Sequence, residues 1–257
     1  MSLTGKRALV CGASGGIGRE IAIAFASAGI EIIALARRIE QLESLRTEVH
    51  AAGGRLNILV GDLQQRDTVC AEVEALLADG PIHILINNTG GPKGGPILDA
   101  SESDFESAFG RHVLAAHRLS QLLVPGMTAA GYGRIINIVS TSVYEPIPNL
   151  GVSNTIRGAM ASWAKSLSRE LPPGVTINNV LPGFTDTPRL TQLRQGRASK
   201  SGISDQAVLE GWLAQVPEGR LAQPQETAQA ALFLVSPAAA YIRGVSLPVD
   251  GGRLRSI

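Results

Sequence analysis

The stretch VCGASGGIGREIA, residues 10–22, decides the fold of this chain. It follows an apolar run that begins at Arg7 and leads directly into a segment of helical periodicity. Its glycines Gly12, Gly16 and Gly18 allow a tight turn and let a phosphate group approach the backbone, while the helix behind them presents the positive end of its dipole. A glycine-rich turn between a strand and a helix predicts a dinucleotide-binding unit, although the same spacing also occurs as a simple tight connection.

The rest of the chain repeats this alternation of strand and helix. Apolar runs without polar alternation are typical of strands that are covered on both faces, and we expect them at residues 7–11, 31–36, 56–60, 83–87, 134–139, 175–181 and 245–249. Helical patterns lie between them, at residues 16–28, 39–52, 67–78, 103–129, 151–171, 205–215 and 225–235. Such alternation predicts right-handed βαβ crossovers. We therefore expect a single α/β domain over residues 1–257, with a doubly wound, Rossmann-like, parallel seven-stranded sheet and helices on both faces.

The composition indicates a small-molecule partner. A chain of 257 residues with a net charge of +1, few aromatic residues and no dense run of Lys and Arg is not typical of a nucleic-acid-binding surface. No run of about 18 apolar residues is present, so neither a membrane span nor a signal peptide is indicated, and we expect a cytoplasmic protein. The cysteines Cys11 and Cys70 have neither metal-ligand spacing nor a redox partner, so we expect packing roles and no metal site.

The end of the second predicted strand bears on the choice of nucleotide. The sequence there, LARRIEQL, lacks the acidic residue that hydrogen-bonds the ribose 2′-hydroxyl of NAD and offers Arg37 and Arg38 instead. Guanidinium groups match a 2′-phosphate bidentately, so we expect NADP(H), with Arg37 as the better contact. The alternative is that the arginines form a solvated helix start. A basic residue at position 15 could also reach the 2′-phosphate, but this chain has Gly15 there.

Four further motifs follow the glycine-rich turn: GDL at 61–63, NNTG at 87–90, LPGFTDTP at 181–188 and VDGG at 249–252. Singly, each also suits a turn, a backbone-capping amide or a strand end. Together and in this order, they resemble the short-chain dehydrogenase/reductase family over essentially the full length of the chain. The general likeness is to its 3-oxoacyl-carrier-protein reductase-like group.

The resemblance implies which residues contact NADP(H). Thr187 stands where the family carries a threonine for the nicotinamide amide. The full set of implied contacts is Gly12, Ser14, Gly15, Gly16, Ile17, Gly18, Arg37, Arg38, Asp62, Leu63, Asn88, Gly90, Arg157, Pro182, Gly183, Thr185 and Thr187.

The catalytic positions depart from the family pattern. The family uses an Asn, Ser, Tyr and Lys tetrad, in which the tyrosine exchanges a proton with the substrate oxygen. Ser140 matches the serine, but Ser153 stands at the tyrosine position, Arg157 at the lysine position and His112 at the asparagine position. Residues four apart on a helix share a face, so Ser153 and Arg157 can still point together toward a cofactor.

The proton donor is therefore open. A serine hydroxyl is a far poorer acid than a tyrosine, and a guanidinium does not release protons near neutral pH. His112, with an ordinary pKa of about 6.5, and Tyr144 are candidate donors, and water is a third. Alternatively, His112 is an inert buried histidine and Tyr144 only lines the substrate pocket.

A long connection at residues 182–204 separates the sixth strand from the next helix, and we expect a substrate-covering flap at about 184–215. This segment holds four basic residues that could attract an acidic substrate, such as a carrier-protein thioester, or could simply be solvated. They are Arg189, Arg194, Arg197 and Lys200.

Two functions compete. One is an NADP(H)-dependent oxidoreductase that acts on a carbonyl or alcohol with an unconventional proton donor, and the other is a catalytically silent NADP(H)-binding sensor or assembly subunit. Segments 103–129 and 151–171 carry apolar and small residues around much of their circumference, so we also expect a homo-oligomer, either a dimer or a homotetramer.

Overall fold

The computed structural model describes residues 3–256 and contains one seven-stranded parallel sheet with the order β3-β2-β1-β4-β5-β6-β7. This confirms the predicted doubly wound α/β fold. The strands are β1 (Arg7–Cys11), β2 (Glu31–Ala36), β3 (Leu56–Val60), β4 (Ile84–Asn87), β5 (Gly133–Ile138), β6 (Val175–Pro182) and β7 (Ser246–Val249).

The order of the strands reverses next to β1. This strand pairs with β2 on one side and with β4 on the other. In open parallel sheets, such a reversal leaves a crevice outside the carboxyl ends of the strands, because the connecting chains leave in opposite directions. The glycine-rich turn follows β1 and therefore lies at this crevice.

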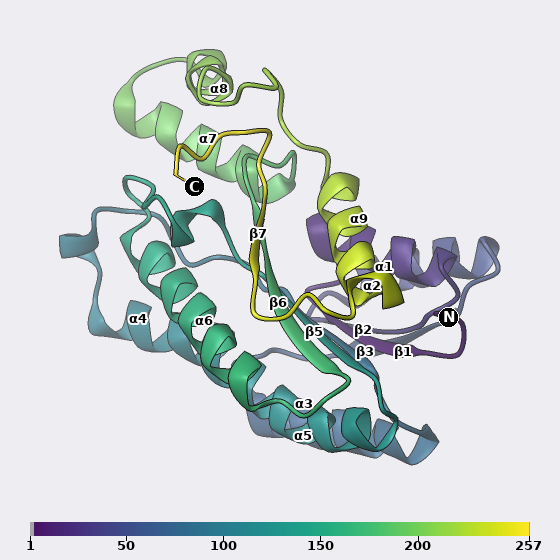
Figure 1. The fold of residues 1–257 in the computed structure, drawn as a ribbon. Coiled ribbons are helices and arrows are strands. Elements are labelled where there is room, and N and C mark those ends of the chain that lie inside the picture. The colour runs from purple at the N-terminus through teal and green to yellow at the C-terminus, as the bar shows by residue number, and fades with distance from the viewer. Residues whose placement is uncertain (1–2, 257) are drawn as a thin grey trace.

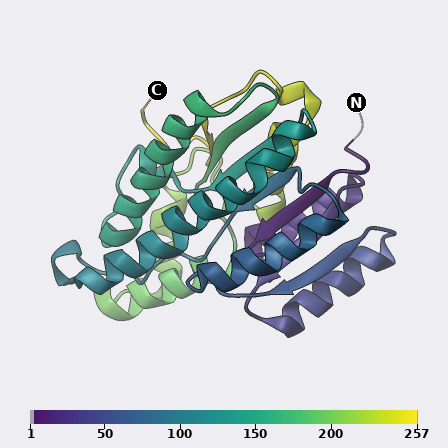
Figure 2. The same cartoon turned by 90° about the horizontal axis from the view of Figure 1, so that it is seen from below.

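Helices cover both faces of the sheet (Figure 1). Buried side chains of α1, α2 and α9 pack on one face, and those of α3, α5 and α6 pack on the other. Figure 2 shows the second layer from below, where its blue to green helices lie side by side across the sheet. The helices are α1 (Gly16–Ser27), α2 (Ile39–Ala51), α3 (Arg66–Leu76), α4 (Glu102–Phe109), α5 (Ala115–Ala129), α6 (Gly151–Glu170), α7 (Pro188–Ser201), α8 (Asp205–Leu213) and α9 (Pro224–Val235), with 3₁₀ turns at Leu77–Asp79, Ile97–Asp99, Thr141–Val143 and Pro237–Ala239.

The core explains why the strands lack polar alternation. Every residue of β1, β5 and β6 is buried, because helices cover both faces of these strands. Phe25 of α1 fills the first layer, and Leu119, Leu123 and Met127 of α5 fill the second. Packing on both faces thus fixes the positions of the carboxyl ends of the strands relative to one another.

One predicted helix is interrupted. The segment predicted as a continuous helix over 103–129 consists of α4, a π-helical turn at Gly110–Leu114 and α5. A π turn accommodates one extra residue and changes the direction of the side chains that follow, and such turns are frequent at functional sites. Here it holds His112 in the interior of the protein.

The connection at 182–204 also differs from the prediction, because it contains α7. The Thr187 hydroxyl accepts a hydrogen bond from the Leu190 N–H, Pro188 occupies the first turn, and Gly202 ends the helix with a φ of 70°. No residue of α7 is fully buried, so the helix lacks the apolar periodicity by which it could have been predicted. Helices α7 and α8 stand beyond the carboxyl ends of the strands (Figure 1).

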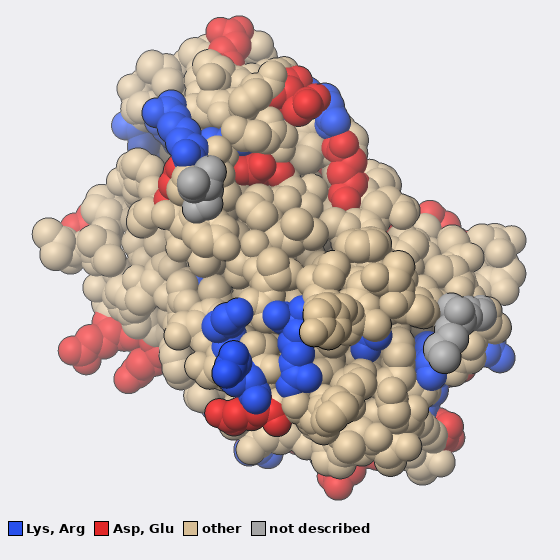
Figure 3. All heavy atoms as spheres, viewed as in Figure 1, with Lys and Arg blue, Asp and Glu red and all other residues tan. Residues whose placement is uncertain are grey.

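Charged side chains of both signs are scattered over the face in Figure 3, and Lys and Arg gather near the C-terminal half of α6. There, Lys165 donates to the Gly244 carbonyl at 3.1 Å, and Arg243 donates to three carbonyls at the end of the helix. Arg243 thus satisfies carbonyls that the C-terminal end of α6 leaves free, whereas Lys165 ties the helix to the segment before β7. Within residues 3–256, no helix is both long and apolar enough to cross a membrane.

Candidate active site

The glycine-rich turn packs directly against Asn88, at the end of β4. A Cβ on Gly12 would lie 2.6 Å from the Asn88 carbonyl oxygen, and one on Gly18 would lie 2.3 Å from the Gly12 carbonyl oxygen. The Asn88 side-chain amide donates to the Cys11 and Gly12 carbonyls at 3.2 and 3.3 Å. Only glycine fits at these two positions, because the backbone and the amide occupy the space that a side chain would need.

Helix α1 begins at this turn without a side-chain cap and without an acidic residue in its first turn. Its first N–H groups are therefore available to an anion, as a nucleotide pyrophosphate requires. Gly16 has a φ of 54°, and a Cβ there would lie 3.3 Å from the Thr187 methyl carbon. The start of α7 therefore lies against the turn, and the residues present fit a dinucleotide.

The two arginines after β2 have different partners. The Arg38 guanidinium donates to the Ser14 carbonyl at 3.2 Å and to the Ser14 hydroxyl at 3.1 Å. Arg37 lies 3.5 Å from the Asp62 carboxylate, and its side chain is 69% exposed. Arg38 is thus held on the glycine-rich turn, a contact that the sequence did not reveal, whereas Arg37 remains open to a ligand.

The other predicted cofactor residues lie at the carboxyl edge of the sheet. Asp62 accepts from the Gln64 N–H at 3.0 Å, which fixes the turn after β3 together with its neighbour Leu63. A Cβ on Gly183 would lie 2.8 Å from the Asp250 Cα, so the Pro-Gly segment packs on the VDGG motif. The remaining residues lie at or after the ends of β1, β4 and β6 in the chain, and they are Ile17, Gly90, Pro182 and Thr185.

The side chain of Arg157 lies across the ends of two central strands. It is 8% exposed, and its guanidinium donates to the Ile138 carbonyl at 2.9 Å and to the Thr89 carbonyl at 3.4 Å. Burial, and then the charge of Arg189, lower the pKa of Arg157 to about 10. Arg157 therefore keeps its positive charge at neutral pH and has no proton to give there.

The two predicted serines, Ser140 and Ser153, differ in their surroundings. Ser140 follows β5, and its hydroxyl accepts a hydrogen bond from the Ser142 N–H at 3.1 Å. Its hydroxyl hydrogen stays available to a substrate oxygen. Ser153 lies on α6 one turn before Arg157 and is partly exposed, so both helical residues share one face, as the spacing predicts.

His112 is not an acid at neutral pH. It is 4% exposed, and burial, followed by the charges of Arg157 and Arg111, lowers its pKa to about 2 despite a hydrogen bond with the Gly90 backbone. The ordinary pKa of about 6.5 on which its predicted role as a proton donor depends is therefore wrong for this environment. The imidazole is neutral and can only hold or orient its neighbours.

Tyr144 is 50% exposed, and its hydroxyl donates to the Ser246 carbonyl in β7 at 3.4 Å. This contact directs the phenol toward the edge strand. Its predicted role as a proton donor requires it to leave that contact.

Only one of the four basic residues in the connection faces the site. The Arg189 guanidinium donates to the Pro92 carbonyl at 2.6 Å. Arg194 forms an ion pair with Asp205 at 2.9 Å, and Arg197 and Lys200 are exposed on α7. Arg189 therefore differs from the others in its direction, which neither charge nor spacing in the sequence could indicate.

Two further arrangements have no counterpart in the sequence analysis. Side chains in register across four strands form a hydrogen-bonded row from Asn87 to Asn137, to Asn179 and to Ser246, with distances of 2.8, 2.8 and 3.0 Å. The regular placement of asparagines near the ends of three strands is the signal that could have found it. The row links the strand ends that precede Ser140 and to which Arg157 of α6 donates its hydrogen bonds.

The second arrangement joins α8 to the segment that follows β5. Phe184 stacks on Trp212 with a centroid distance of 5.1 Å, and the Arg253 guanidinium lies 4.8 Å from the Phe184 ring centroid. Arg253 also donates to the Thr141 hydroxyl at 2.9 Å, next to Ser140. These contacts connect the segment beyond the sheet with the predicted catalytic serine.

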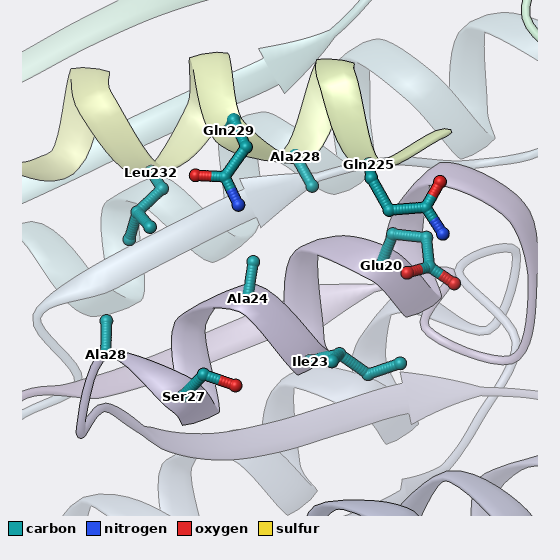
Figure 4. Close-up of a pocket in the computed structure, with 9 residues that line it drawn as sticks. All are labelled: Glu20, Ile23, Ala24, Ser27, Ala28, Gln225, Ala228, Gln229 and Leu232. Atoms are coloured by element: carbon teal, nitrogen blue, oxygen red, sulfur yellow. The ribbon is translucent and has the colours of Figure 1, made fainter. Parts of the chain in front are cut away.

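A separate groove lies between α1 and α9 (Figure 4). Small and apolar side chains such as Ala24, Ala228 and Leu232 line it, and Glu20 is its one ionisable lining residue. None of the predicted site residues lines this groove. It is therefore distinct from the candidate active site.

Comparisons with known proteins agree with this geometry. A family model described as enoyl-(acyl carrier protein) reductase matches residues 12–253. Gluconate 5-dehydrogenase of Gluconobacter oxydans is 32% identical over 98% of this chain and 95% of its own length, and 3-oxoacyl-(acyl-carrier-protein) reductase of Escherichia coli is 34% identical over 98% of each. The structure of L-sorbose reductase from Gluconobacter frateurii, complexed with NADPH and L-sorbose, superposes with a TM-score of 0.93 at 29% identity, covering 100% of this chain and 99% of that one. The chain belongs to the short-chain dehydrogenase/reductase family.

Proposed function

We propose that the protein is an NADP(H)-dependent oxidoreductase that interconverts a carbonyl compound and an alcohol. The observation that carries the proposal is the uncapped start of α1 behind Gly12 and Gly18, with the Arg37 and Arg38 guanidiniums beside it. The compared L-sorbose reductase, whose structure holds NADPH, supports the choice of cofactor.

The residues that would hold the cofactor form three groups. The turn from Gly12 to Gly18 would bind the pyrophosphate, Arg37 and Arg38 the 2′-phosphate, and Thr187 the nicotinamide end. When bound, NADP(H) supplies the hydride acceptor or donor. The turns at Asp62–Leu63, Asn88–Gly90 and Pro182–Thr185 would complete the cleft.

The chain's own residues then act on the substrate oxygen. The Ser140 hydroxyl donates a hydrogen bond to it and holds it in place. Arg157 stabilises the negative charge that develops on this oxygen, because its guanidinium is buried and protonated. Ser153 can donate a second hydrogen bond from the same face of α6, but its hydroxyl is too weak an acid to serve as the proton source.

Because none of the nearby side chains can donate the proton, we infer that water is the proton source. His112 is neutral, Tyr144 contacts β7, and Arg157 does not release a proton near neutral pH. Proton transfer from water makes the reaction slower, because a positioned general acid accelerates it about 10²- to 10⁴-fold. We therefore infer a slow enzyme with an intact site for the substrate oxygen.

The replacement of tyrosine and lysine by Ser153 and Arg157 also favours a second candidate, a catalytically silent NADP(H)-binding sensor or assembly subunit. Both candidates bind NADPH, and they differ in turnover. NADPH titration followed by assays with ketones, sugars and 3-oxoacyl thioesters separates them. Binding with turnover supports the enzyme, binding without any turnover supports the silent protein, and no binding contradicts both.

Residues 184–215, with α7 and α8, would act as the flap over the substrate, since they lie beyond the strand ends and Thr187 reaches the glycine-rich turn. We also propose a cytoplasmic homotetramer. Exposed apolar side chains next to the π turn, Phe109 and Leu114, support a contact between subunits. Sedimentation equilibrium would test the assembly, and a monomer at micromolar concentration would contradict it.

A further inference from the structure

Two guanidiniums meet at the candidate active site without an acidic partner. Arg157 comes from α6 and Arg189 from α7. Within residues 3–256, no carboxylate lies within 4.0 Å of either guanidinium, and their polar partners are the carbonyls of Ile138, Thr89 and Pro92. Arg194, also on α7, does have an acidic partner, Asp205. The pair at the site is therefore electrostatically unbalanced.

The two side chains face a common space above Gly91. A Cβ on this residue would lie 3.9 Å from Arg157 Nη2, 3.8 Å from Arg189 Nη2 and 4.0 Å from Arg189 Nε. Gly91 has no such atom, so the space is open to a ligand atom. The Nε and Nη2 edge of Arg189 is the edge with which a guanidinium binds the two oxygens of a carboxylate.

Without an anion, burying the two guanidinium charges next to each other is unfavourable in free energy. A charged group removed from water is stabilised only by an opposite charge or by sufficient hydrogen bonds, and each arginine here disfavours the charge of the other. Burial lowers the pKa of both side chains, and Arg189 lowers that of Arg157 further. An anion between them would offset both effects.

The cofactor's own anionic groups have other positions. The pyrophosphate fits the uncapped start of α1, and the 2′-phosphate fits Arg37 and Arg38. Arg189 instead belongs to the segment proposed as the flap, which closes over the substrate. The unbalanced charge therefore faces the substrate side of the cleft.

We propose that Arg157 and Arg189 bind a carboxylate of the substrate above Gly91, so that the protein acts on oxo acids or hydroxy acids. This inference rests on the proposed function for its reaction, but the anion site stands on the arginine pair alone. Arg189 is then the residue that determines specificity, while Arg157 serves both the carboxylate and the reacting oxygen.

The first test compares acids with their uncharged esters. The protein with NADPH is assayed with acetoacetate, 4-oxopentanoate and 5-oxohexanoate and with the methyl ester of each. At least one acid should exceed its ester in kcat/KM by about 10- to 100-fold, as expected for a charge-assisted hydrogen bond. Esters that react as well as all three acids, or better, overturn the inference while the proposed function stands.

The second test measures binding and does not depend on turnover. Calorimetric titration of the NADP⁺ complex with 4-oxopentanoate should show binding that Arg189→Gln weakens about 10- to 100-fold and Arg189→Lys weakens less. Arg197→Gln, an exposed neighbour on the same helix, is the matched control and should change nothing. Equal binding by wild type and Arg189→Gln, or no binding by wild type, contradicts the anion site.

NADPH titration of the same variants separates the two proposals. Arg189→Gln should bind NADPH within about twofold of wild type. A tenfold loss would assign Arg189 to the cofactor and overturn the inference. If wild type binds no NADPH at all, the proposed function fails, and titration of the free protein with 4-oxopentanoate still decides whether the arginine pair binds a carboxylate. Melting temperatures of each variant show whether Arg189→Gln remains folded.

Discussion

Arg157 stands where the family has a lysine, and this replacement changes the chemistry available at the position. The family pattern and the spacing on α6 correctly place its side chain toward the ends of β4 and β5. What the arginine contributes there is a fixed charge, because a guanidinium keeps its proton. The proposed chemistry at this site is therefore stabilisation of charge without a positioned acid.

This proposal predicts the effect of restoring the family pair. The double substitution Ser153→Tyr, Arg157→Lys should raise kcat about 10²- to 10⁴-fold, because it supplies a positioned acid in place of water. Ser153→Ala should change kcat no more than a few-fold, because the serine is not the acid. Steady-state rates at saturating NADPH check both. A loss of more than 100-fold in Ser153→Ala would show that the proton passes through this hydroxyl.

The glycine-rich turn permits a second prediction at the level of single residues. Gly18→Ala should lower NADPH affinity at least tenfold and destabilise the protein by about 1–3 kcal/mol, because its Cβ would lie 2.3 Å from the Gly12 carbonyl oxygen. Gly211→Ala is the control, since no atom lies within 4 Å of its Cβ and alanine favours a helix. Fluorescence titration and thermal melting provide the measurements, and equal NADPH affinity in Gly18→Ala would count against the turn as the cofactor site.

At the level of single residues, the sequence indicated where side chains lie more readily than it indicated their pKa values and contacts. The motif spacing predicts Ser140, Ser153 and Arg157 at the site, and Ser153 and Arg157 do lie one turn apart on α6. It could not predict the low pKa of His112, because that depends first on burial in a π turn and then on Arg157, which only folding brings close, as well as on the adjacent Arg111. The contact of Arg38 with Ser14 likewise depends on a side-chain direction that no spacing encodes.

Among the elements, the buried strands were predictable and the exposed helix was not. Apolar runs are typical of strands covered on both faces, as β1, β5 and β6 are, whereas the edge strands β3 and β7 are partly exposed and were predicted from the same kind of run. Helix α7 buries no residue, and its only sequence signals are Thr187, Pro188 and Gly202 at its ends. Its stability comes from contacts with α8 and with the strand ends, which are tertiary.

The anchoring of α8 leads to a prediction about the proposed flap. Trp212 is 6% exposed and stacks on Phe184, whose ring also contacts the Arg253 guanidinium. Trp212→Ala should therefore release residues 188–213, raise the substrate KM about tenfold or more and leave NADPH affinity within a few-fold. Limited proteolysis should show new cleavage within this segment. Cleavage and KM unchanged from wild type would mean that the stack does not hold the segment in place.

At the scale of the whole molecule, two helical layers hold a stiff sheet whose carboxyl edge carries the site. The hydrogen-bonded row from Asn87 to Ser246 crosses this edge, and the buried histidines lie at both ends of the same central strands. His112 lies near the carboxyl edge, and His83 immediately precedes β4 at the opposite edge. Both are buried as neutral groups, so protonation should act on the stability of the whole protein.

This burial predicts a pH dependence with a definite sign. Burial, with the nearby charges of Lys6 and Arg7, lowers the pKa of His83 to about 4, and the pKa of His112 is about 2. Below about pH 6.5 the unfolded chain binds more protons at these histidines than the folded protein does, so the free energy of unfolding falls as the pH falls and is insensitive to them above that value. Between pH 6.5 and 5.5 the loss should be about 1–2 kcal/mol, reduced from the full two-proton value by solvent screening. Urea denaturation at several pH values measures it, and the double variant His83→Gln, His112→Gln should flatten the slope. A variant that keeps the wild-type slope would mean that other groups carry the pH dependence.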